Sequence, residues 1–366
     1  MSEPAAAPAP PSEATPPPPL AAGHKEAAEI QERRAKVRAL RAEGVNPYPD
    51  AFPDRTEIAA ILAAHDPAAL GAGTQDALAY RIAGRITARR GHGRTVFLDV
   101  RDRSGTLQAY ARADGLSDAR FRRLLSLDVG DVAGFEGRLH VTQRGQLALA
   151  VEEATLIAKA LRPPPDKHHG VEQQELRYRH RELDLIANAG ARELLLLRAR
   201  VTWALREWMQ AKGFIEVDPP LLEPVFGGAS ARPFVTRHQA LGRDVYLRIS
   251  SEVHLKRFIV GGMEKVYDLG RFFRNEGISP RHSPEFTMLE WMHSYIDYME
   301  LAEFVEQMVS TVAREALGTT TIRRDGRAID LAPPWRRLSV RDGIRERTGV
   351  DVTDATPEQL SAALDG

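Results

Sequence analysis

The sequence predicts an α+β protein with two folded domains. The first observation is a series of short strands between residues 76 and 160, separated by turn signals and interrupted by one helix. The second is a strand-rich segment after residue 213, framed by two amphipathic helices. The third is Pro163-Pro164-Pro165, which breaks both patterns and favours an extended chain between them. A length of 366 residues and a hydrophobic content of 43% agree with two domains, each with its own core.

The residues before the first sheet are predicted to form a tail and a helical extension. Residues 1–23 are rich in proline and alanine, which predicts a disordered tail and neither a secretory signal nor a transit peptide. Residues 24–43 have apolar positions at helical spacing, and residues 58–64 predict a second, short helix. The range 24–75 is therefore expected to be a helical extension.

Five strands with a helix before the fourth favour an OB barrel over residues 76–160. A generic antiparallel meander fits the same pattern. The predicted strands are 81–88, 95–101, 107–111, 131–142 and 146–156, and the predicted helix is 119–125.

Residues 161–190 are expected to be a stiff, extended linker, followed by a second domain over 191–366. A helix is predicted from residue 192 to 212, and Asp325-Gly326 predicts a hairpin turn between 319–324 and 327–331. The apolar stripe of that first helix comprises Leu194, Leu197, Val201, Leu205 and Trp208. A later helix has its stripe at Leu301, Val305, Met308 and Val312.

Composition excludes several classes of function. The chain has no cysteine, which excludes a disulfide framework, a cysteine-ligated zinc and a thiol nucleophile. Its 50 basic and 50 acidic residues balance, so any nucleic-acid contact must come from a local patch. No apolar run reaches membrane-spanning length, and a cytoplasmic location is the default expectation.

The stretch from Arg271 to Glu276, followed by Phe286 to Glu290, indicates two strands joined by the polar loop 277–285. Side chains in strands alternate between faces. If the strands pair, one face carries a cation, an aromatic ring and a carboxylate, as a site for a nucleotide triphosphate and a cationic small molecule needs. The alternative is an exposed cross-strand ion pair. The residues sharing this face are Gly270, Phe272, Arg274, Phe286, Met288, Glu290 and Met292.

These residues resemble the second signature motif of class II aminoacyl-tRNA synthetases, and the chain from about Glu26 to Gly366 resembles the bacterial-type lysyl-tRNA synthetases. The matching segments are 273–277, 282–287, Glu290, 227–234, 246–249, Glu252, 255–257 and 261–262. Further matches upstream are 160–163, 166–167, 177–179 and 183–186.

The resemblance implies that ATP and L-lysine form lysyl-adenylate, with Mg²⁺ as cofactor, and that tRNA(Lys) then accepts the lysyl group. It places Arg274 on the α-phosphate, Glu276 at the adenine and near the tRNA end, His282 on the outer phosphates and Phe286 against the adenine ring. Such a reaction needs positioned charge and no protein nucleophile.

The resemblance also assigns the lysine side of the site. Glu252 and Glu290 match two carboxylates around the substrate ammonium, and Gly228 lies where the backbone meets the α-amine. Without the resemblance, both glutamates would be interpreted as exposed strand residues. Met292 departs from the family, which usually has tyrosine there, so we expect a weakened or altered lysine pocket.

In the barrel, Arg90, Phe97 and Gln108 match the family's anticodon-reading residues. Exposed aromatic side chains stack on single-stranded bases, and polar side chains read base edges. The alternative places Phe97 in the barrel core. Pro220 matches the proline of the first class II motif, so the resemblance implies a homodimer.

The third class II motif is not found before Gly366. The resemblance places the family's metal-binding carboxylates after Gly366 as well. We therefore expect either part of a longer protein or a shortened relative that binds tRNA without full catalysis. Transfer of lysine to another acceptor, and an aspartate or asparagine synthetase, are further alternatives.

Overall fold

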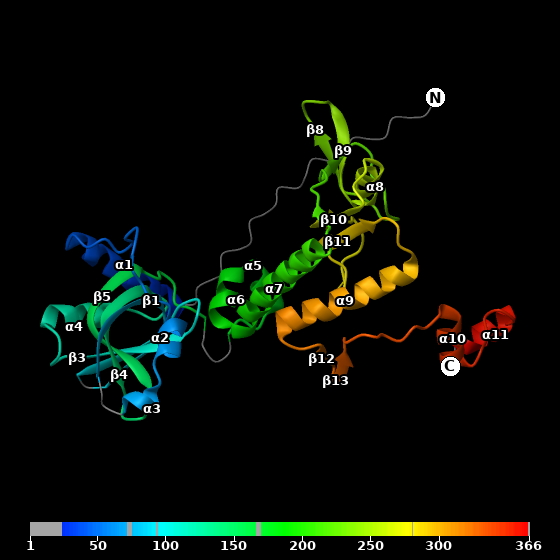
Figure 1. The fold of residues 1–366 in the computed structure, drawn as a ribbon. Helices are drawn as coiled ribbons and strands as arrows, with labels where there is room; N and C mark the ends of the chain where they lie inside the picture. Colours follow the sequence, from blue (N-terminus) through cyan, green and yellow to red (C-terminus); the bar gives the residue numbers. More distant parts are fainter. Residues whose placement is uncertain (1–23, 72–74, 93, 166–169, 280, 365–366) are drawn as a thin grey trace. The chain divides into compact units, whose positions relative to one another are not determined.

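The computed structural model describes residues 24–71, 75–92, 94–165, 170–279 and 281–364 (Figure 1). The predicted tail and the matched pair Asp166-Lys167 lie outside these residues. The chain divides into two compact units, one ending at Ala191 and the other beginning at Arg192. Each unit is described by itself.

The first unit contains a closed barrel with the strand order β1-β2-β3-β5-β4, which confirms the OB fold. Strands β3 and β5 run parallel, and the other neighbours run antiparallel. Helix α4 (Asp118–Ser126) begins after Ser117, whose hydroxyl accepts a hydrogen bond from the backbone N–H of Arg120. The strands are β1 (Gln75–His92), β2 (Thr95–Arg101), β3 (Thr106–Arg112), β4 (Val132–Val141) and β5 (Leu147–Ala158).

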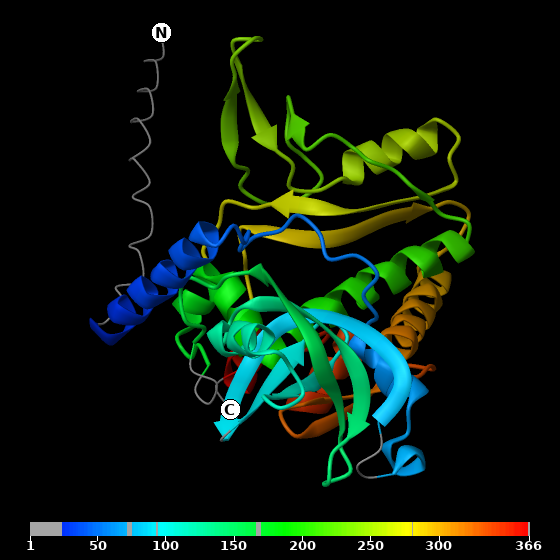
Figure 2. The same cartoon turned by 90° about the vertical axis from the view of Figure 1, so that its left-hand side faces the viewer.

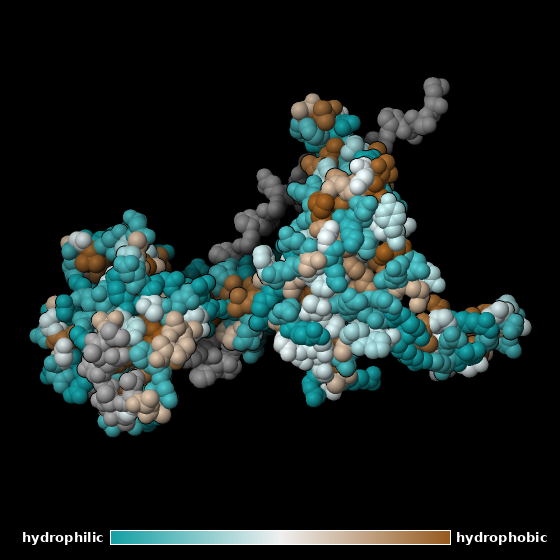
Figure 3. All heavy atoms as spheres, viewed as in Figure 1, coloured by the Kyte–Doolittle hydropathy of each residue, from teal (hydrophilic) through white to brown (hydrophobic). Residues whose placement is uncertain are grey.

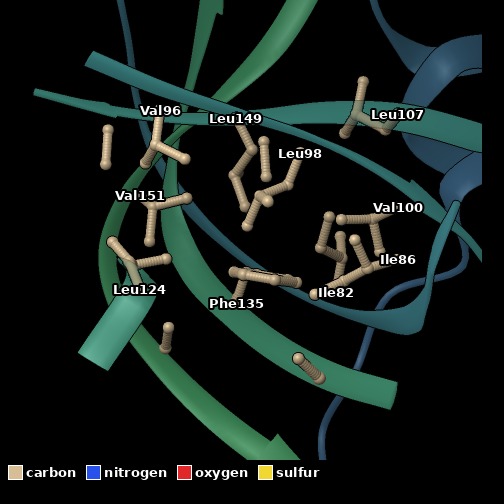
Figure 4. Packing of buried hydrophobic residues seen from close by; sticks show 14 of the residues in the cluster. Ile82, Ile86, Val96, Leu98, Val100, Leu107, Leu124, Phe135, Leu149 and Val151 are labelled. Carbon is tan, nitrogen blue, oxygen red and sulfur yellow. The ribbon is translucent and has the colours of Figure 1, made fainter. Parts of the chain in front are cut away.

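Strand alternation separates the barrel core from its outer face. In β2, Val96, Leu98 and Val100 are buried in the core (Figure 4). Phe97 and Asp99 alternate with them, so they point outward, and both are half-buried. The interpretation of Phe97 as a core residue is therefore wrong.

The extension before the barrel consists of α1 (His24–Ala42), α2 (Ile58–Ala64) and α3 (Pro67–Leu70). The short helix α3 was not predicted. Arg33 of α1 is 3% exposed and donates from Nη1 to the backbone oxygens of Val129 and Ala160, each at 3.0 Å. A buried guanidinium that satisfies two barrel carbonyls fixes α1 against the barrel.

The prediction of an extended linker over 161–190 is wrong where α5 (Gln174–Arg179) and α6 (Arg181–Ala187) form. Asp184 is buried and accepts from Arg177 Nε at 2.8 Å, Arg181 Nη1 at 2.9 Å and Asn188 Nδ2 at 2.7 Å. These charge-assisted bonds close the two helices on each other, an effect that local composition did not indicate.

The second unit is built on a sheet with the order β11-β10-β6. One face of the sheet packs on helices α7 and α9 (Figures 1 and 2). Between the helices, Trp208 and Phe304 contact each other with ring centroids 4.4 Å apart. Leu194 is 65% exposed, so its assignment to the apolar stripe is wrong. The elements are α7 (Ala189–Ala211), β6 (Ile215–Glu216), β10 (Lys265–Phe273), β11 (Glu285–His293) and α9 (Tyr298–Leu317).

On the other side of β10 and β11 lie helix α8 (Glu252–Val260) and a second sheet with the order β7-β9-β8 (Figure 2). Its strands are β7 (Leu222–Glu223), β8 (Val235–His238) and β9 (Arg243–Leu247). The sequence did not indicate α8, because Val253, His254 and Leu255 alternate as in a strand. Glu252 therefore begins a helix, and its interpretation as a strand residue is wrong.

The end of the described chain contains the predicted hairpin, β12 (Thr321–Arg324) and β13 (Arg327–Asp330), followed by α10 (Val340–Thr348) and α11 (Pro357–Leu364). Asp325 and Gly326 have φ values of 50° and 76°, as the tight turn between the strands requires. In the described part of the chain, no helix combines the length and apolar character that a bilayer span requires.

Candidate functional site

The candidate site is built on the buried guanidinium of Arg248, which follows β9 and is 1% exposed. Its Nε donates to the backbone oxygen of Arg271 at 3.0 Å, and its Nη1 donates to that of Pro219 at 3.2 Å. Nη1 also lies 2.8 Å from Oδ2 of Asp268, and Cζ lies 4.3 Å from the ring centroid of Phe272. One side chain thus connects strand β10 with the segment before β7.

Gly270 leaves the space that this guanidinium occupies. A Cβ at Gly270 would lie 2.2 Å from Nη2 of Arg248 and 2.9 Å from Oδ1 of Asp268. Burial raises the pKa of Asp268, although the charge of Arg248 opposes the shift. The close approach of Arg248 to the strand therefore depends on the missing side chain.

The predicted pairing of the two strands is confirmed, and it places the predicted residues on one face. Arg274 lies just after β10; its N–H donates to the oxygen of Pro284 at 2.9 Å. The N–H of Asn275 donates to the oxygen of Arg232 at 2.7 Å, which ties this turn to the matched segment 227–234. The opposed pairs are Phe272 with Phe286, Gly270 with Met288, Asp268 with Glu290 and Val266 with Met292.

A cation and an aromatic ring meet at the end of this pair. Cζ of Arg274 lies 5.2 Å from the ring centroid of Phe286, whose ring lies 6.3 Å from that of Phe272 at 28°. Nε of Arg274 is buried and has no hydrogen-bond partner within the described residues. Because a buried donor without an acceptor is unfavourable, this nitrogen is suited to an anionic ligand.

Glu276 and His282 are exposed on the loop after Arg274. Nδ1 of His282 lies 2.8 Å from the hydroxyl of Ser279. Within the described residues, no hydrogen bond, ion pair or ring contact joins either side chain to Arg274 or Phe286. The structure thus places both on the loop and does not bring them into the cluster.

Glu290, Glu252 and Gly228, three of the residues predicted to bind lysine, meet at two serines. Ser250 Oγ donates to Oε1 of Glu290 at 2.8 Å, and the N–H and Oγ of Ser251 each donate to Oε2 at 2.6 Å. The N–H of Glu252 donates to Ser250 Oγ at 3.1 Å. Gly228 has a φ of +85°, and a Cβ there would lie 2.9 Å from the same oxygen. The sequence analysis assigned no role to either serine. The sequence indicates them only as two consecutive hydroxyl residues directly before Glu252.

A cavity of about 520 Å³ lies along the outer edge of β11 and is lined by Glu252, Glu290 and Met292, together with Tyr298 of α9. Glu252 also pairs with Lys256 one helical turn away. That pair is largely exposed, so a ligand cation can replace it at little cost.

The outer face of the barrel brings together the three residues predicted to read bases. Arg90 Nη2 lies 2.7 Å from Oδ1 of Asp99, and Gln108 Nε2 lies 3.5 Å from the same oxygen. Phe97 lies opposite Tyr110, with the rings 6.2 Å apart at 25°. All except Asp99 line a cavity of about 830 Å³.

Three residues of this face were missed. Tyr110 and His140 extend the row of rings, with centroids 5.1 Å apart, and Asp99 orients Arg90 and Gln108. Burial lowers the pKa of His140, which favours its neutral ring. The sequence could have indicated these three residues, because each occupies an outward-facing position in the alternation of its strand.

The residues present do not fit a metal site. Within the described part of the chain, no group of three histidine, aspartate or glutamate side chains lies close enough to hold an ion.

Comparison with known proteins defines the class. Residues 173–360 match the family "tRNA synthetases class II (D, K and N)", and residues 80–157 match the "OB-fold nucleic acid binding domain". The chain belongs to the class II tRNA synthetases and is an aminoacyl-tRNA synthetase in architecture.

The curated relatives narrow the family further. The lysine–tRNA ligase of Dehalococcoides mccartyi is 44% identical over 335 residues, which are 91% of this chain and 67% of the relative. The lysine–tRNA ligase of Moorella thermoacetica is 45% identical (91% and 66%), and that of Bacillus subtilis is 41% identical (90% and 66%). The chain belongs to the lysine–tRNA ligase family and spans about two thirds of the length of these relatives. These comparisons do not support the alternatives of another acceptor or another amino acid.

Gly270→Ala is expected to lower the free energy of unfolding of the second unit by about 1–3 kcal/mol, because the new methyl group clashes with a guanidinium held by three acceptors. Urea unfolding followed by tryptophan fluorescence measures the change. Gly277→Ala is the matched control, since a Cβ there meets nothing within 4 Å. Equal stability of the two variants would show that Arg248 relocates freely.

Proposed function

We propose that the protein ligates L-lysine to tRNA(Lys) through a lysyl-adenylate, with ATP as the source of energy and Mg²⁺ as cofactor. The observation that carries the proposal is the shared sheet face, where Arg274 lies over Phe286 and Glu290 lies four residues further along the same strand. Membership of the lysine–tRNA ligase family supports the same substrates.

In the first step, an oxygen of the lysine carboxylate attacks the α-phosphorus of ATP, and the bond to the bridging oxygen breaks to release pyrophosphate. Arg274 binds the α-phosphate oxygens and stabilises the charge that develops on them. Phe286 stacks on the adenine ring, and His282 contacts the outer phosphates.

Lysine is selected by carboxylates. Glu290 and Glu252 bind the substrate's ammonium groups at the cavity beside β11, and the backbone at Gly228 meets the α-amine. A neutral analogue would leave a partly buried carboxylate unpaired, at a cost of about 3–5 kcal/mol for a fully buried one. Met292 has a thioether at the position where the family usually has a tyrosine hydroxyl. A thioether cannot donate a hydrogen bond to the substrate, and this loss weakens the pocket.

In the second step, a hydroxyl oxygen at the 3′ end of the tRNA attacks the lysyl carbonyl carbon, AMP leaves, and the hydroxyl loses its proton. Glu276 lies at the adenine and near the tRNA end in this proposal. The barrel holds the anticodon, with Phe97 stacked on one base and Arg90 and Gln108 at base edges. Because translation in the cytoplasm uses the charged tRNA that this reaction makes, we propose a cytoplasmic location.

Arg274→Ala is expected to lower kcat/KM for lysine-dependent ATP–pyrophosphate exchange by about 100- to 1,000-fold, because one preorganised charge on the transition state is lost. The assay uses the protein as its source cells make it, and it also measures aminoacylation of tRNA(Lys) transcript. Arg271→Ala is the control, since Arg271 is exposed and points to the opposite sheet face beside Glu285. Wild-type protein that neither exchanges pyrophosphate nor charges tRNA(Lys) would overturn the proposed function.

Phe97→Ala is expected to weaken tRNA(Lys) binding by about 5- to 150-fold, which corresponds to the loss of one base stack of about 1–3 kcal/mol. Filter binding at fixed salt measures the affinity. Tyr48→Ala removes a ring of the same unit that lies outside the cavity, and it should leave the affinity near wild type. Equal losses in both variants would argue against this face.

We also propose a homodimer, whose interface includes Pro220. Pro220 is exposed, and so are the apolar side chains of Leu221, Leu222, Val225 and Trp203, the last to 62%. Large apolar side chains that are exposed at a surface favour association. Figure 3 shows further apolar patches over the β8–β9 hairpin and α8.

Light scattering of the purified protein is expected to give twice the mass of one chain. Trp203→Glu should shift this mass toward that of the monomer, because a charge replaces an apolar contact. Val340→Glu is the control, an equally radical change at an exposed apolar residue far along the chain. A wild-type monomer at micromolar concentration would contradict the proposal.

A further inference from the structure

We propose that Ser250 and Ser251 are positioning residues of the lysine pocket, which orient the carboxylate of Glu290 and so set the affinity and chain-length selectivity for the substrate. This inference rests on the proposed function and assigns a role to two residues outside it. It is carried by the hydrogen bonds between the turn before α8 and strand β11.

Three donors converge on a single carboxylate. Ser251 donates to Oε2 of Glu290 from both its backbone N–H and its hydroxyl, each at 2.6 Å. Ser250 Oγ lies 2.8 Å from Oε1 and 3.1 Å from Oε2. Each carboxylate oxygen accepts about two hydrogen bonds. Ser251 therefore saturates Oε2, and the remaining capacity is on Oε1, which is the oxygen left to accept from a substrate ammonium.

Ser250 links this carboxylate to the other two lysine-side positions. Its hydroxyl donates its one proton to Glu290 and accepts from the N–H of Glu252 at 3.1 Å. The same oxygen would lie 2.9 Å from a Cβ at Gly228. A change at Ser250 thus acts on the geometry of the whole pocket.

Ser251 holds Glu290 next to a second carboxylate, that of Asp268. Asp268 and Glu290 are opposed in the β10–β11 register, and their like charges repel. The hydroxyl of Ser251 donates its one proton to Glu290, and Arg248 pairs with Asp268. Without Ser251, Glu290 is free to turn away from Asp268 and from the position that it holds now.

Among the described residues of β11, no side chain on the face of Glu290 supplies an equivalent donor. The next residue on that face is Met292, and a thioether cannot donate. The orientation of Glu290 therefore depends on the serine turn. A fixed acceptor favours the ammonium that reaches it, so lysine is preferred over ornithine, which is one methylene shorter.

The test compares Ser250→Ala and Ser251→Ala with wild type in lysine-dependent ATP–pyrophosphate exchange, using the protein as its source cells make it. We expect KM for lysine to rise about tenfold in each variant, as for the loss of one hydrogen bond to a charged group, with kcat changed less than about threefold. The preference for lysine over ornithine should fall in both variants. Ser251→Thr keeps the hydroxyl and should restore KM.

Ser310→Ala is the matched control, because it removes a buried serine hydroxyl of α9 that has no partner in the described structure. It should leave KM and the lysine preference unchanged. Thermal melting of each variant shows whether the fold is retained.

The outcomes separate the two proposals. Active wild type together with alanine variants of unchanged KM and unchanged lysine preference would overturn the role of the serines alone. A rise in KM that Ser251→Thr does not reverse would assign the loss to packing and would also overturn it. Wild type without lysine-dependent exchange would overturn the proposed function and this inference with it.

Discussion

The second unit depends on one buried ion pair, that of Arg248 with Asp268. Moving a guanidinium out of water is unfavourable unless its donors find acceptors, and here they find two backbone oxygens and a carboxylate. The acceptors come from β10 and from the segment before β7, so neither can move without leaving a buried charge unsatisfied. The ring of Phe272 covers the cation from one side. The site face is thereby held rigid although it carries several polar groups.

The same strands serve two purposes because their side chains alternate. Tyr267, Leu269, Leu289 and Trp291 face the helices and form the apolar core with Trp208 and Phe304. Asp268, Gly270 and Glu290 face the opposite side and carry the charged groups. A shift of the β10–β11 register by one residue would exchange the two sets, which would bury carboxylates and expose the core. The stability of the core therefore fixes the register on which the geometry of the site depends.

The sequence predicted the parts that local periodicity determines. The pairing of β10 with β11, the barrel strands and the Asp325-Gly326 turn follow from alternation and turn chemistry, and the structure confirms them. Helix α8 was missed because its first turn alternates like a strand, and the linker helices were missed because Asp184 joins side chains that are separate in the sequence. Ser250 and Ser251 were missed for the same reason, since their partner Glu290 lies about 40 residues away. Long-range hydrogen bonds have no local signature.

The two carboxylates of the proposed lysine pocket differ in how much freedom they retain, and this difference suggests a division of roles. Glu252 is the first residue of α8, and its only ion pair in the described structure is an exposed one with Lys256, which a ligand replaces easily. Glu290 is held by three serine donors and faces a second carboxylate across the strand pair. A carboxylate held in one position discriminates by geometry, because it cannot move to meet an ammonium that lies elsewhere. A carboxylate that is free to rotate can move to the ammonium and discriminates less. Under the proposed function, discrimination of side-chain length therefore belongs to Glu290, and general attraction of the cationic substrate belongs to Glu252.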